Sequence, residues 1–127
     1  MDSTLKRVLV VEDNSIARQV ETQIIGQFPC QVDAACDGAE ALKLLNANHY
    51  DLVFMDINLP DTDGLKLTET IRAMGNGNKK VPIVALTTYD DNTHHNQATW
   101  VGVNSYITKP LTVEKCEKAF KKFVRIC

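Results

Sequence analysis

Five residues with the side chains needed for phosphoryl chemistry stand at the ends of apolar runs in this sequence. Glu12 and Asp13 follow the first run, and Asp56 follows a later one. Carboxylate oxygens suit Mg²⁺, an ion that keeps several waters and is completed by phosphate oxygens. Thr87 and Lys109 end two further runs and offer a hydroxyl and an ammonium to an oxyanion. Together these residue types indicate phosphoryl transfer assisted by Mg²⁺.

The three carboxylates would be costly to gather without such a role. Two like charges about 4 Å apart repel by roughly 4 kcal/mol at an effective dielectric constant of 20. The whole stability of a domain is only about 5–15 kcal/mol. A cluster of this kind therefore requires a protonated carboxyl or a bound cation. The sequence has no P-loop and no G-x-G-x-x-G motif, so a nucleotide substrate is not indicated.

Short apolar runs alternate along the chain with amphipathic stretches, which predicts strands that alternate with helices. Ile16, Val20 and Ile24 are spaced at i, i+4 and i+8, which predicts one apolar stripe of a helix. Thr112 is expected to cap the last helix. The strands are predicted at residues 7–11, 31–35, 51–55, 81–87 and 105–108, and the helices at residues 15–27, 37–49, 65–74, 92–101 and 113–125.

This alternation predicts one α/β domain over residues 1–127, with a flavodoxin-like, doubly wound parallel sheet and five helices. In the strand order 2-1-3-4-5, the first and third strands are neighbours at the point where the order reverses, and ligands bind there. We therefore expect Glu12, Asp13 and Asp56 to meet, with Thr87 and Lys109 on the same rim.

Composition limits the other classes of function. The net charge of −2 argues against a general nucleic-acid binder, and the basic stretch at residues 115–125 is expected to be a solvated helix face. No apolar run approaches the length that spans a bilayer, and the start of the chain has no secretory apolar region. We therefore expect a cytoplasmic protein that does not insert into membranes.

The chain resembles a receiver domain of two-component signalling, as found in response regulators and in hybrid histidine kinases. The resemblance covers nearly the whole chain and rests on VLVVEDN, DLVFMDINLPDTDG, VPIVALTT and YITKP, in this order and at these spacings. The VEDN form and the extension before it favour the receiver of a hybrid histidine kinase over a stand-alone regulator.

The resemblance implies that Asp56 accepts the phosphoryl group and that Mg²⁺ is the cofactor. Asp13 would bind the ion directly, and Glu12 would act through water. Asp56 itself and the backbone carbonyl of Asn58 would complete the protein ligands.

The resemblance also implies a switch. Thr87 would move to hold the phosphoryl group, with help from the backbone N–H of Thr88 and from Lys109. Tyr106 would then turn inward, and the bond before Pro110 would be cis. The helix after Thr88, the fifth strand and the last helix would change their partner-binding surface.

The implied partners are a histidine kinase dimerisation domain, a histidine phosphotransfer protein, or both, and a homodimer could form on phosphorylation. Direct binding of nucleic acid is not expected. The chain would catalyse its own phosphorylation and dephosphorylation and would not be a turnover enzyme. Asn58 and Tyr89 are predicted to tune the lifetime of the phosphorylated state. Trp100 could belong to the core or to a partner contact.

Two alternatives remain. A haloacid-dehalogenase-like phosphatase also uses an Asp at a strand end, but it needs a second Asp two residues later, where this chain has Asn58. A receiver-like module that binds partners without phosphorylation would be expected to lack an essential residue. All five residues of the predicted centre are present here.

Overall fold

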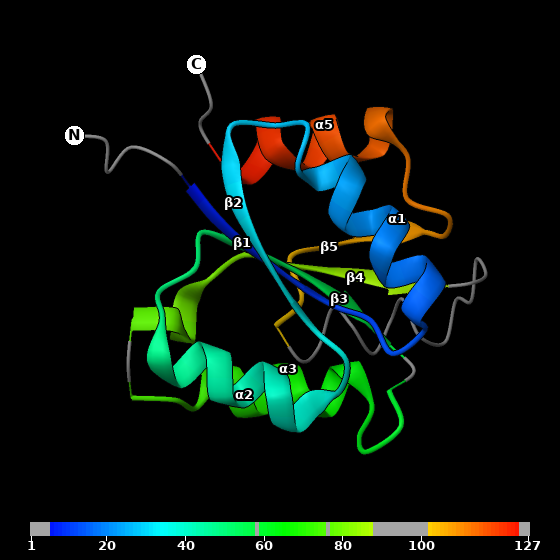
Figure 1. The fold of residues 1–127 in the computed structure, drawn as a ribbon. Helices are drawn as coiled ribbons and strands as arrows, with labels where there is room; N and C mark the ends of the chain where they lie inside the picture. Colours follow the sequence, from blue (N-terminus) through cyan, green and yellow to red (C-terminus); the bar gives the residue numbers. More distant parts are fainter. Residues whose placement is uncertain (1–5, 58, 76, 88–101, 125–127) are drawn as a thin grey trace.

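The computed structural model describes residues 6–57, 59–75, 77–87 and 102–124. A single parallel sheet with the strand order β2-β1-β3-β4-β5 crosses the molecule (Figure 1). The predicted fold class and strand order are therefore confirmed. The strands are β1 (Lys6–Val11), β2 (Cys30–Ala35), β3 (Leu52–Asp56), β4 (Ile83–Thr87) and β5 (Ser105–Thr108).

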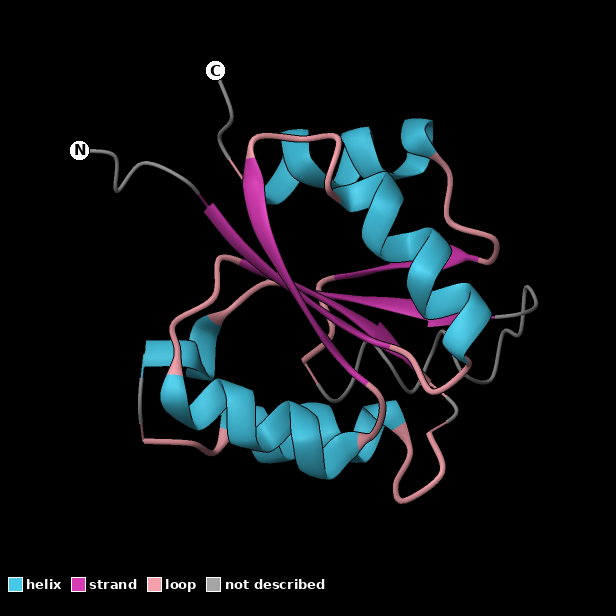
Figure 2. Ribbon diagram, in the orientation of Figure 1, coloured by secondary structure: helices cyan, strands magenta, loops and turns pink. Residues whose placement is uncertain are grey.

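Helices cover both faces of the sheet (Figure 2). Helices α1 and α5 lie on one face, and α2 and α3 lie on the other (Figure 1). The helix expected at residues 92–101 lies outside the described residues. In the described part of the chain, no helix has the length and apolar content needed to cross a bilayer. The helices are α1 (Ser15–Ile25), α2 (Gly38–Ala47), α3 (Gly64–Arg72), α5 (Val113–Phe123) and a short 3-10 helix, η1 (Gly77–Lys80).

The sheet separates two apolar cores, which explains why its central strands are apolar without alternation. Val8 and Val10 of β1 face α1 and α5, whereas Leu9 and Val11 face α2 and α3. All five residues of β3 are buried. Strands covered on both faces are typical of parallel sheets whose crossovers are helices.

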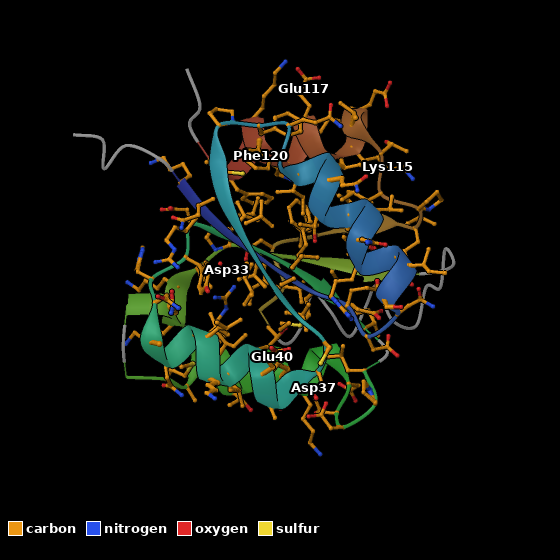
Figure 3. All side chains as sticks on the ribbon, in the orientation of Figure 1. Asp33, Asp37, Glu40, Lys115, Glu117 and Phe120 are labelled. Atoms are coloured by element: carbon orange, nitrogen blue, oxygen red, sulfur yellow. The ribbon has the colours of Figure 1, made fainter. Side chains whose placement is uncertain are left out.

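Each helix begins at a side chain that accepts a hydrogen bond from the backbone. Thr112 accepts from the N–H of Lys115, so its predicted role as the cap of α5 is confirmed. Asp37 accepts from the N–H of Glu40, and the Glu40 carboxylate accepts from the N–H of Cys36 (Figure 3). This pair differs from a capping box in one respect: Glu40 accepts from the residue before the N-cap and not from the N-cap itself, and together the two bonds fix the beginning of α2.

The four described helices each end two residues before the predicted end. Directly after α2 and α5 the backbone turns to an extended conformation, at Asn48 and Val124. After α1 and α3 the next residue, Gly26 or Ala73, still has helical φ and ψ. At the end of α5, for example, Val124 is extended, with φ −127° and ψ 123°, and its side chain is buried. Tertiary packing of this side chain outweighs the helical pattern.

The predicted apolar stripe of α1 faces the core only at Ile24, which packs against the core under α1 and α5, so the prediction was wrong for Ile16 and Val20. Ile16 is 72% exposed and Val20 is 48% exposed, whereas the buried residues of the helix are Glu21 and Ile25. The helix is rotated by about one residue from the predicted orientation. This rotation turns Glu21 toward the carboxylates at the end of β1.

A buried asparagine joins three segments at the opposite end of the sheet. The Asn78 amide donates to the carbonyls of Leu45, at 2.6 Å, and Asn48, at 2.7 Å. Its side-chain oxygen accepts from the N–H of Tyr50 at 2.9 Å. Asn78 is 2% exposed, so water cannot replace these bonds. It therefore fixes η1 against the end of α2 and the approach to β3.

Replacing Asn78 with alanine is predicted to lower the free energy of unfolding by about 2–3 kcal/mol, because buried backbone groups lose their partners. Urea unfolding measures this change. Asn46→Ala is the matched control: Asn46 is exposed on α2, and its replacement should change stability by less than about 0.5 kcal/mol. Equal effects of the two substitutions would contradict the structural role of Asn78.

Candidate functional site

Three carboxylates meet where β1 and β3 end. The two strands are parallel neighbours, with Val11 opposite Met55, so the residues that follow β1 lie beside the end of β3. Glu12, Asp13 and Asp56 each offer an oxygen, and these oxygens lie within 4.8 Å of one another. Glu12 and Asp56 are buried, whereas Asp13 is exposed. The structure thus brings together the carboxylates that the sequence placed at this edge.

Lys109 is held over the carboxylates from the loop that follows β5. Its Nζ lies 2.7 Å from Glu12 Oε1 and 3.4 Å from Asp56 Oδ1. Burial alone would raise the pKa of Glu12, but the contact with Lys109 outweighs burial and lowers this pKa. Burial alone would lower the pKa of Lys109, but Glu12 and Asp56 raise it. Both groups are therefore held in their charged forms.

Thr87 is placed on the same rim by strand register. It ends β4, where the preceding Leu86 lies opposite Asp56, and it is 5% exposed. The carbonyl of Thr87 accepts a hydrogen bond from the N–H of Lys109 at 2.6 Å. The next peptide bond, between Lys109 and Pro110, is cis. The backbone therefore links the hydroxyl residue and the ammonium residue directly.

A glycine allows α3 to begin against the backbone of the site. The N–H of Gly64 donates to the carbonyl of Ile57 at 2.7 Å. A Cβ at residue 64 would collide with the carbonyl oxygen of Asp56 and would touch the Cα of Ile57. Only glycine leaves room for this approach, which supports the backbone that carries Asp56.

Glu21 of α1 is a fourth carboxyl group of the site, and it was not among the residues predicted from the sequence. It is 4% exposed, contacts Glu12, and has one oxygen without a hydrogen-bond partner among the described residues. Burial, and then the charge of Glu12, raise the pKa of Glu21 to about 8. The available signal was the spacing of Ala17, Glu21 and Ile25, which forms a second stripe beside the one that was predicted to be apolar.

Some predicted residues cannot be placed. Asn58, Thr88, Tyr89 and Trp100 lie outside the described residues. Tyr106 is described; it lies on β5 and its side chain is 43% exposed.

The donor set suits a divalent ion with a preference for oxygen. Glu12, Asp13 and Asp56 are the carboxylates that could hold it, and Lys109 is the one cation described within salt-bridge distance of Glu12 and Asp56. One ammonium leaves an excess of negative charge in the cluster. Mg²⁺ accepts this kind of site, because it binds a few carboxylates and keeps several waters. A phosphoryl group that arrives at the same edge would find Lys109 and Thr87 as partners for its oxygens.

Comparisons with known proteins agree with this geometry. The family model of the response regulator receiver domain matches residues 8–121. The chain is 34% identical, over 94% of its length, to the peroxide stress-activated histidine kinase mak2 of Schizosaccharomyces pombe, and covers 5% of that kinase. In eight of the curated relatives it matches, six of them histidine kinases and two of them transcription factors, the chain spans 5% to 19% of the relative's length.

Solved structures extend the comparison to three dimensions. The chemotaxis response regulator CheY4 of Vibrio cholerae is 28% identical, with a TM-score of 0.86 and coverage of 94% of this chain and 99% of that one. The response regulator TrrA of Thermotoga maritima, solved in complex with Mg²⁺-BeF, is 29% identical with a TM-score of 0.81. It covers 94% of this chain and 99% of its own.

Glu21→Gln is predicted to stabilise the metal-free protein increasingly as the pH rises. The pKa of Glu21 is raised from 4.5 to about 8, so between these values the folded state keeps a proton that the unfolded state loses. Stability therefore falls as pH rises through this window. Glutamine keeps the shape of the side chain and does not ionise. We expect a gain of about 1–3 kcal/mol at pH 8 that vanishes near pH 4.5.

Urea unfolding in the presence of a chelator, from pH 4.5 to pH 8, measures this difference. Glu117→Gln, which changes an exposed glutamate on α5, is the control and should show no such pH trend. If the difference in the free energy of unfolding between Glu21→Gln and the unsubstituted chain were the same at every pH, the raised pKa of Glu21 would be wrong.

Proposed function

Because this chain belongs to the family of response regulator receiver domains, we propose that it accepts a phosphoryl group from a phosphohistidine on Asp56. Domains of this family are signalling modules rather than turnover enzymes. The observation that carries the proposal is the position of Asp56. Its carboxylate is 3% exposed, lies with Glu12 and Asp13 at the end of β3, and is 3.4 Å from Lys109 Nζ.

The chemistry follows from these contacts. A carboxylate oxygen of Asp56 attacks the phosphorus in line, an O–P bond forms, and the P–N bond to the histidine breaks. The electron pair of the broken bond leaves with the imidazole nitrogen. Lys109, which lies 3.4 Å from Asp56, can turn its ammonium to a phosphoryl oxygen without a large movement. The Thr87 hydroxyl supplies a second hydrogen bond.

Glu12, Asp13, Asp56 and the backbone carbonyl of Asn58 are proposed to hold Mg²⁺. The ion would neutralise the charge that develops on the transferred group. Glu12 would act through water, because its oxygen lies 2.7 Å from the Lys109 ammonium. Asp13 is exposed at the mouth of the cluster and is the more accessible direct ligand.

The phosphoryl group adds negative charge that must be paired again, and this pairing is proposed to drive a switch. Thr87, with the backbone N–H of Thr88, would move toward the group. Thr87 lies opposite Thr108 in the sheet, and its carbonyl holds the N–H of Lys109. A shift of Thr87 would therefore bias β5 and Tyr106 between two states.

The proposed partners are a histidine kinase dimerisation domain or a histidine phosphotransfer protein, and a homodimer on phosphorylation is a further proposal. A partner must bring its histidine to the edge that carries Asp56. An apolar surface lies beside this edge, where Ile16 and Val20 of α1 are exposed. A cavity of 410 Å³ between α1 and Pro110 adjoins Lys109. We further propose that the chain acts in the cytoplasm, as the receiver of a hybrid kinase.

Incubation with acetyl phosphate and Mg²⁺ is predicted to add one phosphoryl group, which intact-mass spectrometry detects. Asp56→Ala should take up none, because it removes the attacking oxygen. Glu117→Gln, a carboxylate change on the exposed face of α5, should be phosphorylated like the unsubstituted chain. If Asp56→Ala took up as many phosphoryl groups per chain as the unsubstituted protein, Asp56 would not be the acceptor.

Asn58 and Tyr89 are proposed to control the water that hydrolyses the acyl phosphate. We predict that Asn58→Ala and Tyr89→Ala each change the dephosphorylation rate by about tenfold, equivalent to about 1.4 kcal/mol in the barrier. The rate is measured as the loss of the phosphoryl group from the phosphorylated chain over time in the presence of Mg²⁺. If both variants dephosphorylate at the rate of the unsubstituted chain, these two residues do not control the hydrolytic water.

A further inference from the structure

The loop between β3 and α3 leaves the acid cluster and reaches the beginning of α2. It contains Asn58, whose carbonyl is a proposed ligand of Mg²⁺, and the structure describes it at Ile57 and at residues 59–63. Its first residue is fixed, because the N–H of Ile57 donates to the carbonyl of Leu86 at 3.1 Å and its carbonyl accepts from the N–H of Gly64 at 2.7 Å. The course of the residues that follow then decides the direction of the carbonyl at position 58.

Asp61, in the middle of this loop, is tied to the first turn of α2 by both of its carboxylate oxygens. Oδ1 accepts from the N–H of Gly38 at 2.9 Å, and Oδ2 accepts from the N–H of Ala39 at 3.0 Å. The first N–H groups of a helix have no partner within the helix, so the loop supplies what α2 lacks. The helix dipole also favours a negative charge here. The bonds, that from Gly38 above all, lower the pKa of Asp61, so it is a carboxylate at neutral pH.

A glycine at the beginning of α2 makes this approach possible. A Cβ at Gly38 would lie 2.7 Å from Cγ2 of Thr62 and 3.2 Å from Oδ1 of Asp61. Carbon atoms in contact are normally about 3.5–4.0 Å apart, so the loop would have to move away. The loop and the helix are therefore fitted closely together at this point, in addition to being hydrogen-bonded.

We propose that Asp61 is a positioning residue for the metal site, which ties the loop to α2 in the course that lets the carbonyl of Asn58 serve as a ligand. Helix α2 is a firm anchor, because Ala41 and Leu45 are buried in the core on its face of the sheet. Ligands of a metal ion depend on such supporting contacts for their orientation. The inference rests on the proposed function, since it concerns the same metal site.

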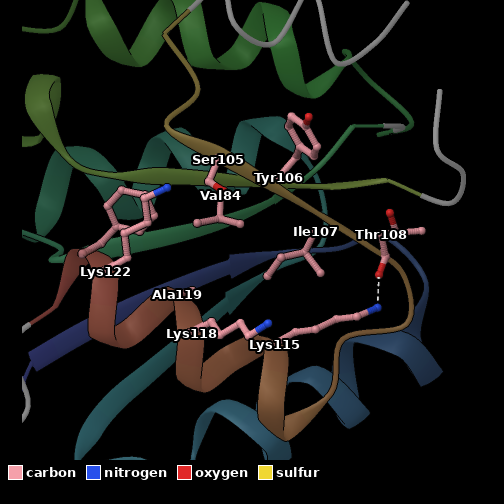
Figure 4. Close-up of a pocket in the computed structure, with 10 residues that line it drawn as sticks. Val84, Ser105, Tyr106, Ile107, Thr108, Lys115, Lys118, Ala119 and Lys122 are labelled. Atoms are coloured by element: carbon pink, nitrogen blue, oxygen red, sulfur yellow. Dashed lines mark hydrogen bonds between the residues drawn. The ribbon is translucent and has the colours of Figure 1, made fainter. Parts of the chain in front are cut away.

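The other loop of the site, which carries Lys109, is held by a different helix. Lys115 Nζ of α5 donates to the carbonyl of Thr108 at 2.7 Å (Figure 4) and to the carbonyl of Pro110 at 3.2 Å. Loss of the Asp61 contact is therefore expected to weaken binding of the ion while Lys109 stays in place for the phosphoryl group.

Asp61→Ala is predicted to raise the Kd for Mg²⁺ about tenfold, because contacts that orient metal ligands typically contribute a factor of about 10–100. Titration of MgCl₂ into the ¹⁵N-labelled chain, followed by NMR at the amides of Glu12 and Asp13, measures this Kd without any phosphorylation. Asp61→Asn keeps one acceptor oxygen and should lose less affinity. Gly38→Ala displaces the loop from the side of the helix and should also raise the Kd.

Asp37→Ala is the matched control, because Asp37 caps the same helix. In the described part of the chain its carboxylate accepts from Cys36 and Glu40, both of which lie outside the loop. Urea unfolding should show that Asp37→Ala and Asp61→Ala both lose stability, whereas only Asp61→Ala changes the Kd for Mg²⁺. In Asp61→Ala, phosphorylation by acetyl phosphate should need more MgCl₂ to reach half of its maximal rate, and saturating MgCl₂ should restore that rate.

Three results would overturn the proposal. The first is an unchanged Kd in Asp61→Ala. The second is an equal rise in Asp37→Ala, which would assign the effect to the end of α2 and not to the loop. The third is a phosphorylation rate in Asp61→Ala that saturating MgCl₂ does not restore. If MgCl₂ shifted no amide at the acid cluster of the unsubstituted chain, the proposed metal site itself would be wrong, and this inference with it.

Discussion

The central electrostatic constraint of the structure is the repulsion among three carboxylates that the sheet brings together, which Lys109 partly balances. The end of β1 supplies Glu12 and Asp13, and the end of β3 supplies Asp56. These oxygens lie within 4.8 Å, with Lys109 the described cation in contact with two of them. The remaining negative charge favours a divalent cation at this edge, and a bound cation together with Lys109 would in turn attract the oxygens of a phosphoryl group. In the proposed function, a bound cation would relieve an electrostatic cost that the topology imposes.

The rest of the fold holds the carboxylates together against their repulsion. The strands that carry the carboxylates are buried on both faces, so their ends cannot separate without opening two apolar cores. Gly64 lets α3 begin directly against the backbone of Asp56. Glu21 adds to the cost, because a carboxyl group at 4% exposure beside Glu12 stays neutral over much of the physiological pH range. The clustered carboxyl groups lower the stability of the folded state at this edge, and the two apolar cores around the sheet offset that loss.

Much of this arrangement was predictable, because strand ends in parallel sheets obey a simple geometric rule. The apolar runs located the strands, and the strand order then placed Glu12, Asp13 and Asp56 at one edge. The rotation of α1 was not predictable from its pattern, since Ile16, Val20 and Ile24 form a more apolar stripe than Ala17, Glu21 and Ile25. The burial of Glu21 is decided by tertiary neighbours, Glu12 among them. The end of α5 was also missed, because the pattern does not show that the backbone becomes extended at Val124, whose side chain is buried.

The central claim is that the acid cluster is a binding site for a divalent cation. Urea unfolding with increasing MgCl₂ tests it most directly, because a ligand of the folded state raises stability by about 2.7 kcal/mol at one hundred times its Kd. The account predicts this rise in the unsubstituted chain and in Glu117→Gln, and its loss in Asp13→Asn, where an exposed carboxylate is removed without disturbing the core. An equal rise in Asp13→Asn, or none in the unsubstituted chain, would contradict it.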